Sequence, residues 1–153
     1  MDLFGVVLGI FMTVLSVFDI RIRKLPIVLL KAGIALALFR PVLFFLLYGS
    51  PAEQQRMFSV ALLGALPGIA VTGLSFISDK VGRGDGIVLV IMGMFESCSF
   101  VTSASCIACL TLACFSAVLL AMHRVGRNTR MPFVPFLTGA YIVLKIFGGR
   151  IGV

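Results

Sequence analysis

Charged residues are almost absent from one long stretch of this chain. Between Gly86 and Met122 the only charged side chain is Glu96. A run of this length is longer than the about 20 apolar residues of one transmembrane helix. We therefore expect two membrane-embedded helices here, joined by a turn in the small polar run 97–105.

The rest of the chain has the same character. Of its 153 residues, 60% are hydrophobic and 12% are charged, whereas a soluble domain has about 25% charged residues. We predict an all-α, polytopic membrane helix bundle that forms a single domain over residues 1–153, with about six transmembrane helices. The predicted spans are 3–18, 25–48, 57–78, two within 86–122, and 132–147, with polar turns at 49–56 and 79–85. We expect a kink or break near Pro41 and an interruption at Pro67-Gly68, because proline removes a helical hydrogen bond.

Basic residues are distributed unevenly between the two sets of turns. One set carries eight Lys or Arg residues and the clear segments of the other carry two, Arg56 and Arg150. Cytoplasmic loops have an excess of basic residues, so we expect the N-terminus outside and the richer set inside. The net charge of +7 then reflects a lipid bilayer as partner, and we expect no nucleic acid. The eight inner residues are Arg21, Arg23, Lys24, Lys80, Arg83, Arg124, Arg127 and Arg130.

Two aspartates are the main functional candidates. Asp19 ends the first apolar stretch and Asp85 closes the turn Gly82-Arg83-Gly84-Asp85-Gly86, both at the predicted cytoplasmic face. An Asp at the centre of a membrane helix costs about 2.5–3.5 kcal/mol, so acids in such segments are functional candidates by default. Two carboxyl groups that share a site do not both ionise readily, and such a pair can supply both an acid and a base.

Peptide hydrolysis is the chemistry that this pair suggests. A base must activate water and an acid must protonate the departing nitrogen, and Gly82 and Gly84 would let the turn approach an extended substrate strand. The alternative is that both acids are helix caps or exposed ion-pair partners of Arg21 or Arg23. Asp79 lies in the same turn as a rival acid without a supporting motif.

Other candidate residues have simpler interpretations. Cys106-x2-Cys109 has a zinc-like spacing, but a second pair is missing, so we predict no metal site and no cofactor. We interpret the four cysteines as small residues that allow close helix packing. Glu96 is expected to be packing or interfacial and His123 solvated. The same packing role is expected for Gly64, Gly68 and Gly73, and snorkelling to either face is expected for Lys31, Arg40 and Lys145.

Three segments carry a family resemblance. Asp19 is followed by basic residues and then by Leu25-Pro26. The segment 81–85, Val-Gly-Arg-Gly-Asp, precedes an apolar run that reaches Gly93, and 131–137 reads Met-Pro-Phe-Val-Pro-Phe-Leu. In this order they resemble the catalytic turns and the last-span Pro-Phe-Gly-Pro-Phe-Leu segment of the type IV prepilin peptidases, which are polytopic Gly-x-Gly-Asp aspartic proteases.

The resemblance extends from Asp19 to the region of Leu144 and implies a function. It implies that Asp19 and Asp85 are catalytic, that Gly82 and Gly84 form the active-site turn, and that the substrates are type IV or Flp-type prepilins or pilin-like proteins. Cleavage would occur at the cytoplasmic face of a prokaryotic cytoplasmic (inner) membrane. The residues of a candidate substrate groove are Pro132, Phe133 and Pro135.

Two departures from the family pattern qualify this expectation. Ile87 occupies the position where the family usually has Lys, and an N-terminal zinc-binding domain linked to pilin methylation is not found. The chain therefore resembles the compact peptidase-only form, and we expect no methyltransferase activity. A small proton-coupled transporter and a catalytically inactive pilus-assembly subunit are the alternatives.

Overall fold

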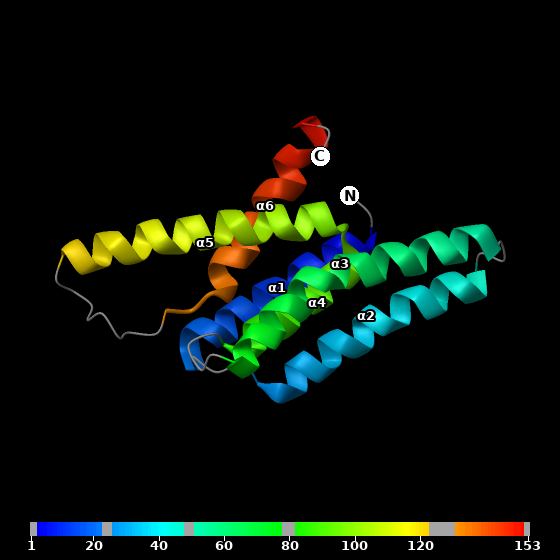
Figure 1. The fold of residues 1–153 in the computed structure, drawn as a ribbon, viewed down its shortest axis with the longest axis horizontal. Coiled ribbons are helices and arrows are strands. Elements are labelled where there is room, and N and C mark those ends of the chain that lie inside the picture. Colours follow the sequence, from blue (N-terminus) through cyan, green and yellow to red (C-terminus); the bar gives the residue numbers. More distant parts are fainter. Residues whose placement is uncertain (1–2, 23–25, 48–50, 78–81, 123–130, 152–153) are drawn as a thin grey trace.

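The computed structural model describes residues 3–22, 26–47, 51–77, 82–122 and 131–151, and this part of the chain forms six α-helices (Figure 1). The all-α prediction is therefore confirmed. Segments of α1, α3 and α5 are long and apolar enough to cross a membrane, which gives the described part of the chain the character of a membrane protein. The helices are α1 (Leu3–Ile22), α2 (Ile27–Leu47), α3 (Pro51–Ile77), α4 (Arg83–Phe95), α5 (Cys98–Ala121) and α6 (Val134–Ile151).

Two helices contain proline and continue through it. Pro41 lies inside α2 and Pro67 inside α3, so the chain breaks at neither proline: the predicted interruption at Pro67-Gly68 is wrong, and of the kink or break expected near Pro41 the break is excluded. Membrane helices tolerate internal proline because neighbouring groups and local adjustments satisfy the carbonyls that it frees. The predicted polar loop 49–56 is also too long, because α3 begins at Pro51. Proline suits the first helical position, where its missing N–H has no partner to lose.

The turn between α4 and α5 is shorter than predicted. Only Glu96 and Ser97 separate the two helices, and the Ser97 hydroxyl caps α5 by accepting from the Phe100 N–H (3.4 Å). Most of the polar run 97–105 is helical, because hydroxyls such as those of Thr102 and Ser105 donate to carbonyls one turn earlier. Helix α4 itself has 13 residues and a length of about 20 Å at 1.5 Å per residue. This is less than the about 30 Å hydrocarbon core of a bilayer.

Helices α3 and α4 pack as a close antiparallel pair. A Cβ added at Gly64 would collide with the Gly93 carbonyl, and one added at Gly68 would collide with the backbone of Val90. Gly86 on α4 is equally close to Thr72 on α3. The packing role of Gly64 and Gly68 is therefore confirmed. Gly73 has open space around its Cα position, so the same prediction is wrong for it.

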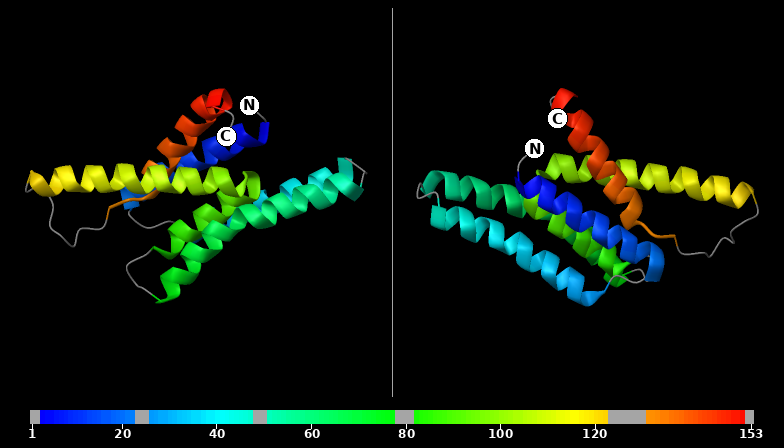
Figure 2. Two further views of the ribbon diagram at one scale, coloured as in Figure 1. Left: turned by 45° about the horizontal axis from the view of Figure 1, so that its top comes forward. Right: turned by 180° about the vertical axis from the view of Figure 1, so that it is seen from behind.

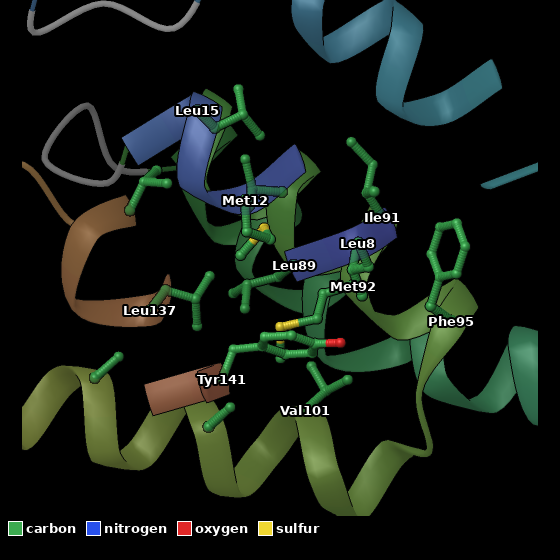
Figure 3. Close-up of a cluster of buried hydrophobic side chains, with 14 of the residues drawn as sticks. Leu8, Met12, Leu15, Leu89, Ile91, Met92, Phe95, Val101, Leu137 and Tyr141 are labelled. Atoms are coloured by element: carbon green, nitrogen blue, oxygen red, sulfur yellow. The ribbon is translucent and has the colours of Figure 1, made fainter. Parts of the chain in front are cut away.

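The hydrophobic core lies mainly between α1, α4 and α6, with the first half of α5 against it (Figure 3). Beyond this core, α2 and α3 extend side by side in one direction and the second half of α5 extends in the other (Figures 1 and 2). Cys106, Cys109 and Cys114 are exposed on α5, so they do not mediate close packing within this chain. The fully buried core side chains include Leu8, Met12, Leu15, Leu89, Met92, Val101 and Leu137.

Some sequence candidates lie outside the described residues. They are Asp79, Lys80, His123, and most basic residues of the predicted inner turns.

Candidate active site

Asp19 lies in the last turns of α1 and points into the bundle. Its side chain is 7% exposed, and its Oδ2 accepts a hydrogen bond from the Val134 N–H (3.2 Å). Val134 is the first residue of α6, where backbone N–H groups have no partner within the helix. A carboxylate at this place also interacts favourably with the helix dipole. Asp19 therefore joins the end of α1 to the start of α6, and the helix-cap interpretation describes part of its role.

Asp85 lies in the first turn of α4, not in the preceding turn as predicted. Its N–H donates to the carbonyl of Gly82 (3.1 Å), which is the N-terminal capping residue of the helix. A Cβ at Gly82 would lie 2.6 Å from Asp85 Oδ2 and 3.2 Å from Cγ. The carboxyl group is thus folded back over Gly82, which has an ordinary extended conformation (φ −67°). Glycine is needed here for space, and not for an unusual backbone angle; Gly84 lies between the two in the same turn.

The fold brings the two aspartates to one end of the bundle, which we call the aspartate end. The last turn of α1 and the first turn of α4 lie together at this end (Figure 1), and the like charges of Asp19 and Asp85 repel each other across it. Their surroundings differ: Asp19 is buried and bonded to α6, whereas Asp85 is partly exposed. Carboxyl groups in unequal surroundings can take different roles, one as acid and one as base.

The Pro-Phe segment forms the start of α6. The Phe133 carbonyl accepts from the N–H groups of Phe136 and Leu137 (both 3.1 Å), and the Phe133 ring packs against the core. Pro135 is the second helical residue and Pro132 precedes the helix, positions where proline fits without loss of a hydrogen bond. These residues therefore start α6 beside Asp19. A substrate groove formed by them stays a prediction.

A groove of about 430 Å³ lies elsewhere, between α1 and α6. Its walls include Gly5, Gly9, Tyr141 and Lys145, and neither aspartate lines it. Ile87, where the sequence departs from the prepilin peptidases that it resembles, is partly buried against the core.

The opposite end of the bundle holds four residues whose association the sequence did not reveal: Arg40, Glu96, Tyr141 and Lys145, here called the Glu96 cluster. Lys145 Nζ lies 2.7 Å from Glu96 Oε1, and the Arg40 guanidinium donates to the Phe95 carbonyl (2.6 Å). Arg40 and Lys145, for which the sequence suggested only snorkelling to a membrane face, therefore make specific polar contacts within the bundle. The sequence contained one indication of this cluster: Glu96 and Lys145 have opposite charges in separate predicted spans, and charges within a membrane tend to pair with one another.

Among the described residues, no group of three or more His, Cys, Asp or Glu side chains could hold a metal ion. Comparison of the chain with protein-family models, with curated protein sequences and with solved structures finds no match.

Proposed function

We propose that this protein is a membrane aspartic endopeptidase that removes the leader peptide of type IV or Flp-type prepilins, or of pilin-like proteins. The observation that carries the proposal is that the fold brings Asp19 and Asp85, from separate helices, to one end of the bundle (Figure 1), where Asp19 is bonded to the first residue of α6. Three segments that resemble prepilin peptidases, around Asp19, Asp85 and 131–137, thus lie at one end of the bundle. The proposal includes about six membrane-embedded helices and the aspartate end at the cytoplasmic face of a prokaryotic inner membrane.

The proposed chemistry needs only the two carboxyl groups and water. The ionised carboxylate accepts a proton from water while the water oxygen attacks the carbonyl carbon of the scissile peptide bond. The protonated carboxyl of the partner then donates its proton to the departing nitrogen as the C–N bond breaks. Asp85 is the more exposed member of the pair, so we infer that substrate approaches from the α4 side.

The core supports this proposal over a proton-coupled transporter. A relay across the bundle would need polar groups between the aspartate end and the Glu96 cluster. The buried side chains of α1 and α4 between these ends include Leu8, Met12, Leu15, Leu89 and Met92 (Figure 3). Among the described residues, this layer offers no acid or base to carry a proton, and its buried Thr138 hydroxyl is bonded to backbone carbonyls of Met12 and Val134.

Leader cleavage is the decisive experiment. The full chain would be co-expressed with a prepilin from the same genome, and cleavage would be followed by the mobility shift of the pilin. We expect cleavage by the wild type, and none by Asp19→Asn or Asp85→Asn. Asp79→Asn and Glu53→Gln are matched controls that remove a carboxylate elsewhere, and both should still cleave.

Each other outcome points to a specific error. Cleavage by both aspartate variants would refute the catalytic pair, and loss of cleavage in Asp79→Asn but not Asp85→Asn would identify a different second acid. If an inserted wild type leaves every candidate prepilin intact, the peptidase proposal fails. Proton flux into reconstituted vesicles would then identify a transporter, and its absence would favour the inactive assembly subunit.

A further inference from the structure

Helix α4 carries a functional candidate at one end and a set of polar contacts at the other. Asp85 is in its first turn, and Glu96 follows its last residue, about 16 Å away along the helix at 1.5 Å per residue. The Glu96 N–H donates to the Met92 carbonyl (3.0 Å), so Glu96 is fixed to the last turn of α4. A contact that holds Glu96 in place therefore also sets the axial position of Asp85.

Arg40 of α2 holds the last turn of α4. Its Nη1 donates to the carbonyl of Phe95 (2.6 Å) and lies 3.4 Å from that of Met94. Carbonyls at a helix C-terminus have no partner within the helix, and a cation there is favoured by the helix dipole. The guanidinium also lies 5.6 Å from the ring centroid of Phe4 in α1 and 5.7 Å from that of Phe95. Arg40 thus bonds the end of α4 to α2, and its guanidinium also contacts α1 through the ring of Phe4.

Glu96 joins the end of α4 to α6. Its Oε1 lies 2.7 Å from Lys145 Nζ and 3.4 Å from the Tyr141 hydroxyl. The side chains of Lys145 and Glu96 are 22% and 14% exposed, so water screens this pair less than an exposed pair. Breaking a largely buried pair leaves one charge without a partner, which is strongly unfavourable.

Helices α1 and α6, against which α4 packs, are also bonded directly to each other. Asp19 binds the Val134 N–H at one end of α1 and α6, and the Tyr141 hydroxyl donates to the Gly5 carbonyl (2.9 Å) at the other. Between these ends the Thr138 hydroxyl lies 3.2 Å from the Met12 carbonyl. The pair α1–α6 is therefore one frame, and the close pair α3–α4 is a second unit that docks against it.

We propose that Arg40, Glu96 and Lys145 are positioning residues, which fix the α3–α4 unit along the α1–α6 frame and so hold Asp85 at its working distance from Asp19. This inference rests on the proposed peptidase function for its catalytic consequence. Its geometric content does not depend on the reaction. The apolar contacts between α4 and α1 resist separation but, being non-directional, they resist sliding less than charged contacts of fixed geometry.

The test combines kinetics with a distance measurement on the full chain in lipid nanodiscs. The variants are Glu96→Gln, Arg40→Gln and the exchange Glu96→Lys with Lys145→Glu, and Glu53→Gln makes the same chemical change elsewhere in the chain. Because a 1 Å misplacement of reacting groups can cost about 100-fold in rate, we expect kcat to fall about 10- to 100-fold in the single variants with KM little changed. The exchange variant should recover most of the rate.

The distance is measured between spin labels at positions 22 and 83, at the ends of α1 and α4, with the four native cysteines replaced by serine. We expect Glu96→Gln and Arg40→Gln to shift or broaden this distance distribution, and Glu53→Gln to leave it unchanged. If Glu96→Gln does not accumulate in the membrane, Glu96→Asp keeps the charge on a shorter side chain and should give a smaller shift of the same kind.

The two readouts separate this inference from the proposed function. Unchanged distances and unchanged kcat in Glu96→Gln and Arg40→Gln, with an active wild type, would overturn the positioning role and leave the peptidase intact. Altered distances in a protein whose wild type cleaves no prepilin would support the positioning role and refute the peptidase. A lower melting temperature with unchanged distance and kcat would reduce the cluster to a stabilising role and overturn the inference.

Discussion

The acidic residues at the two ends of the helix bundle have opposite electrostatic surroundings. At the Glu96 cluster, the acid has a cation at 2.7 Å and a tyrosine hydroxyl at 3.4 Å. At the aspartate end, two acids of like charge lie on separate helices and repel each other, and one of them is buried against a helix N-terminus. An acid with a matched cation contributes to structure, whereas two acids that repel each other in a partly buried site are typical of functional sites. This contrast, and not acidity alone, distinguishes the candidate site.

The largest expected effect tests this contrast directly. Asp85→Asn and Asp19→Asn should each lower the rate of leader cleavage by about 10²- to 10⁴-fold, the usual contribution of a general acid or base. Their melting temperatures should change little, because asparagine keeps the shape and can still accept the Val134 hydrogen bond. Glu96→Gln should give the reverse pattern, with a lower melting temperature and a smaller loss of rate. If the variants at both ends lost rate and melting temperature in the same proportion, the contrast between a catalytic and a structural end would be refuted.

The second expected effect concerns α3–α4, the unit that links the two ends. Gly93→Ala places a methyl group against the Gly64 carbonyl, and backbone cannot move aside as a flexible side chain can. We expect a loss of about 1–3 kcal/mol, the usual range for overpacking. Gly73→Ala is the matched control, because its site is open, and it should be neutral or slightly stabilising. Thermal unfolding of both variants in the same detergent measures the difference.

A smaller effect is expected at Gly82, where activity and stability should separate. A Cβ there would lie 2.6 Å from Asp85 Oδ2, and the carboxyl can rotate away at little cost in folding. Gly82→Ala should therefore lower kcat about tenfold, equivalent to about 1.4 kcal/mol, with nearly unchanged thermal stability. Gly139→Ala, at a site with open space, is the control. Full activity in Gly82→Ala would mean that the carboxyl orientation over Gly82 is not the working one.

The sequence predicts the helices better than it predicts their contacts. Apolar runs locate all six helices within the described part of the chain, since each buried or lipid-facing segment must satisfy its own backbone. The course of α3 through Pro67 and the contacts of Arg40 with α4 depend on which neighbour packs alongside. That neighbour is chosen by glycines such as Gly64 and Gly93 on separate helices. A single sequence records such glycines but not their pairing.

The placement of the candidate site has the same limit. The alternation of predicted spans places Asp19 and Asp85 at the same end, because Asp19 ends the first span and Asp85 follows the third. It does not predict that Asp19 binds Val134, since this bond requires the start of α6 to lie over the end of α1. The sequence also suggested that Gly82 is needed for flexibility of the turn. The structure shows instead that the absence of a side chain at Gly82 leaves space for the Asp85 carboxyl.

The smallest expected effect separates the two roles of Asp19. If Asp19 also caps α6, Asp19→Ala should cost about 0.5–2 kcal/mol of stability, as for other lost N-terminal caps, whereas Asp19→Asn should cost less. Asp85→Ala is the comparison, since among the described residues no hydrogen bond joins its side chain to another helix. Thermal unfolding of Asp19→Ala, Asp19→Asn and Asp85→Ala gives the ranking. Equal stability of Asp19→Ala and Asp19→Asn would show that the bond to Val134 contributes nothing to folding. Under the proposed function, Asp19 would then contribute, like Asp85, to the reaction and not to folding.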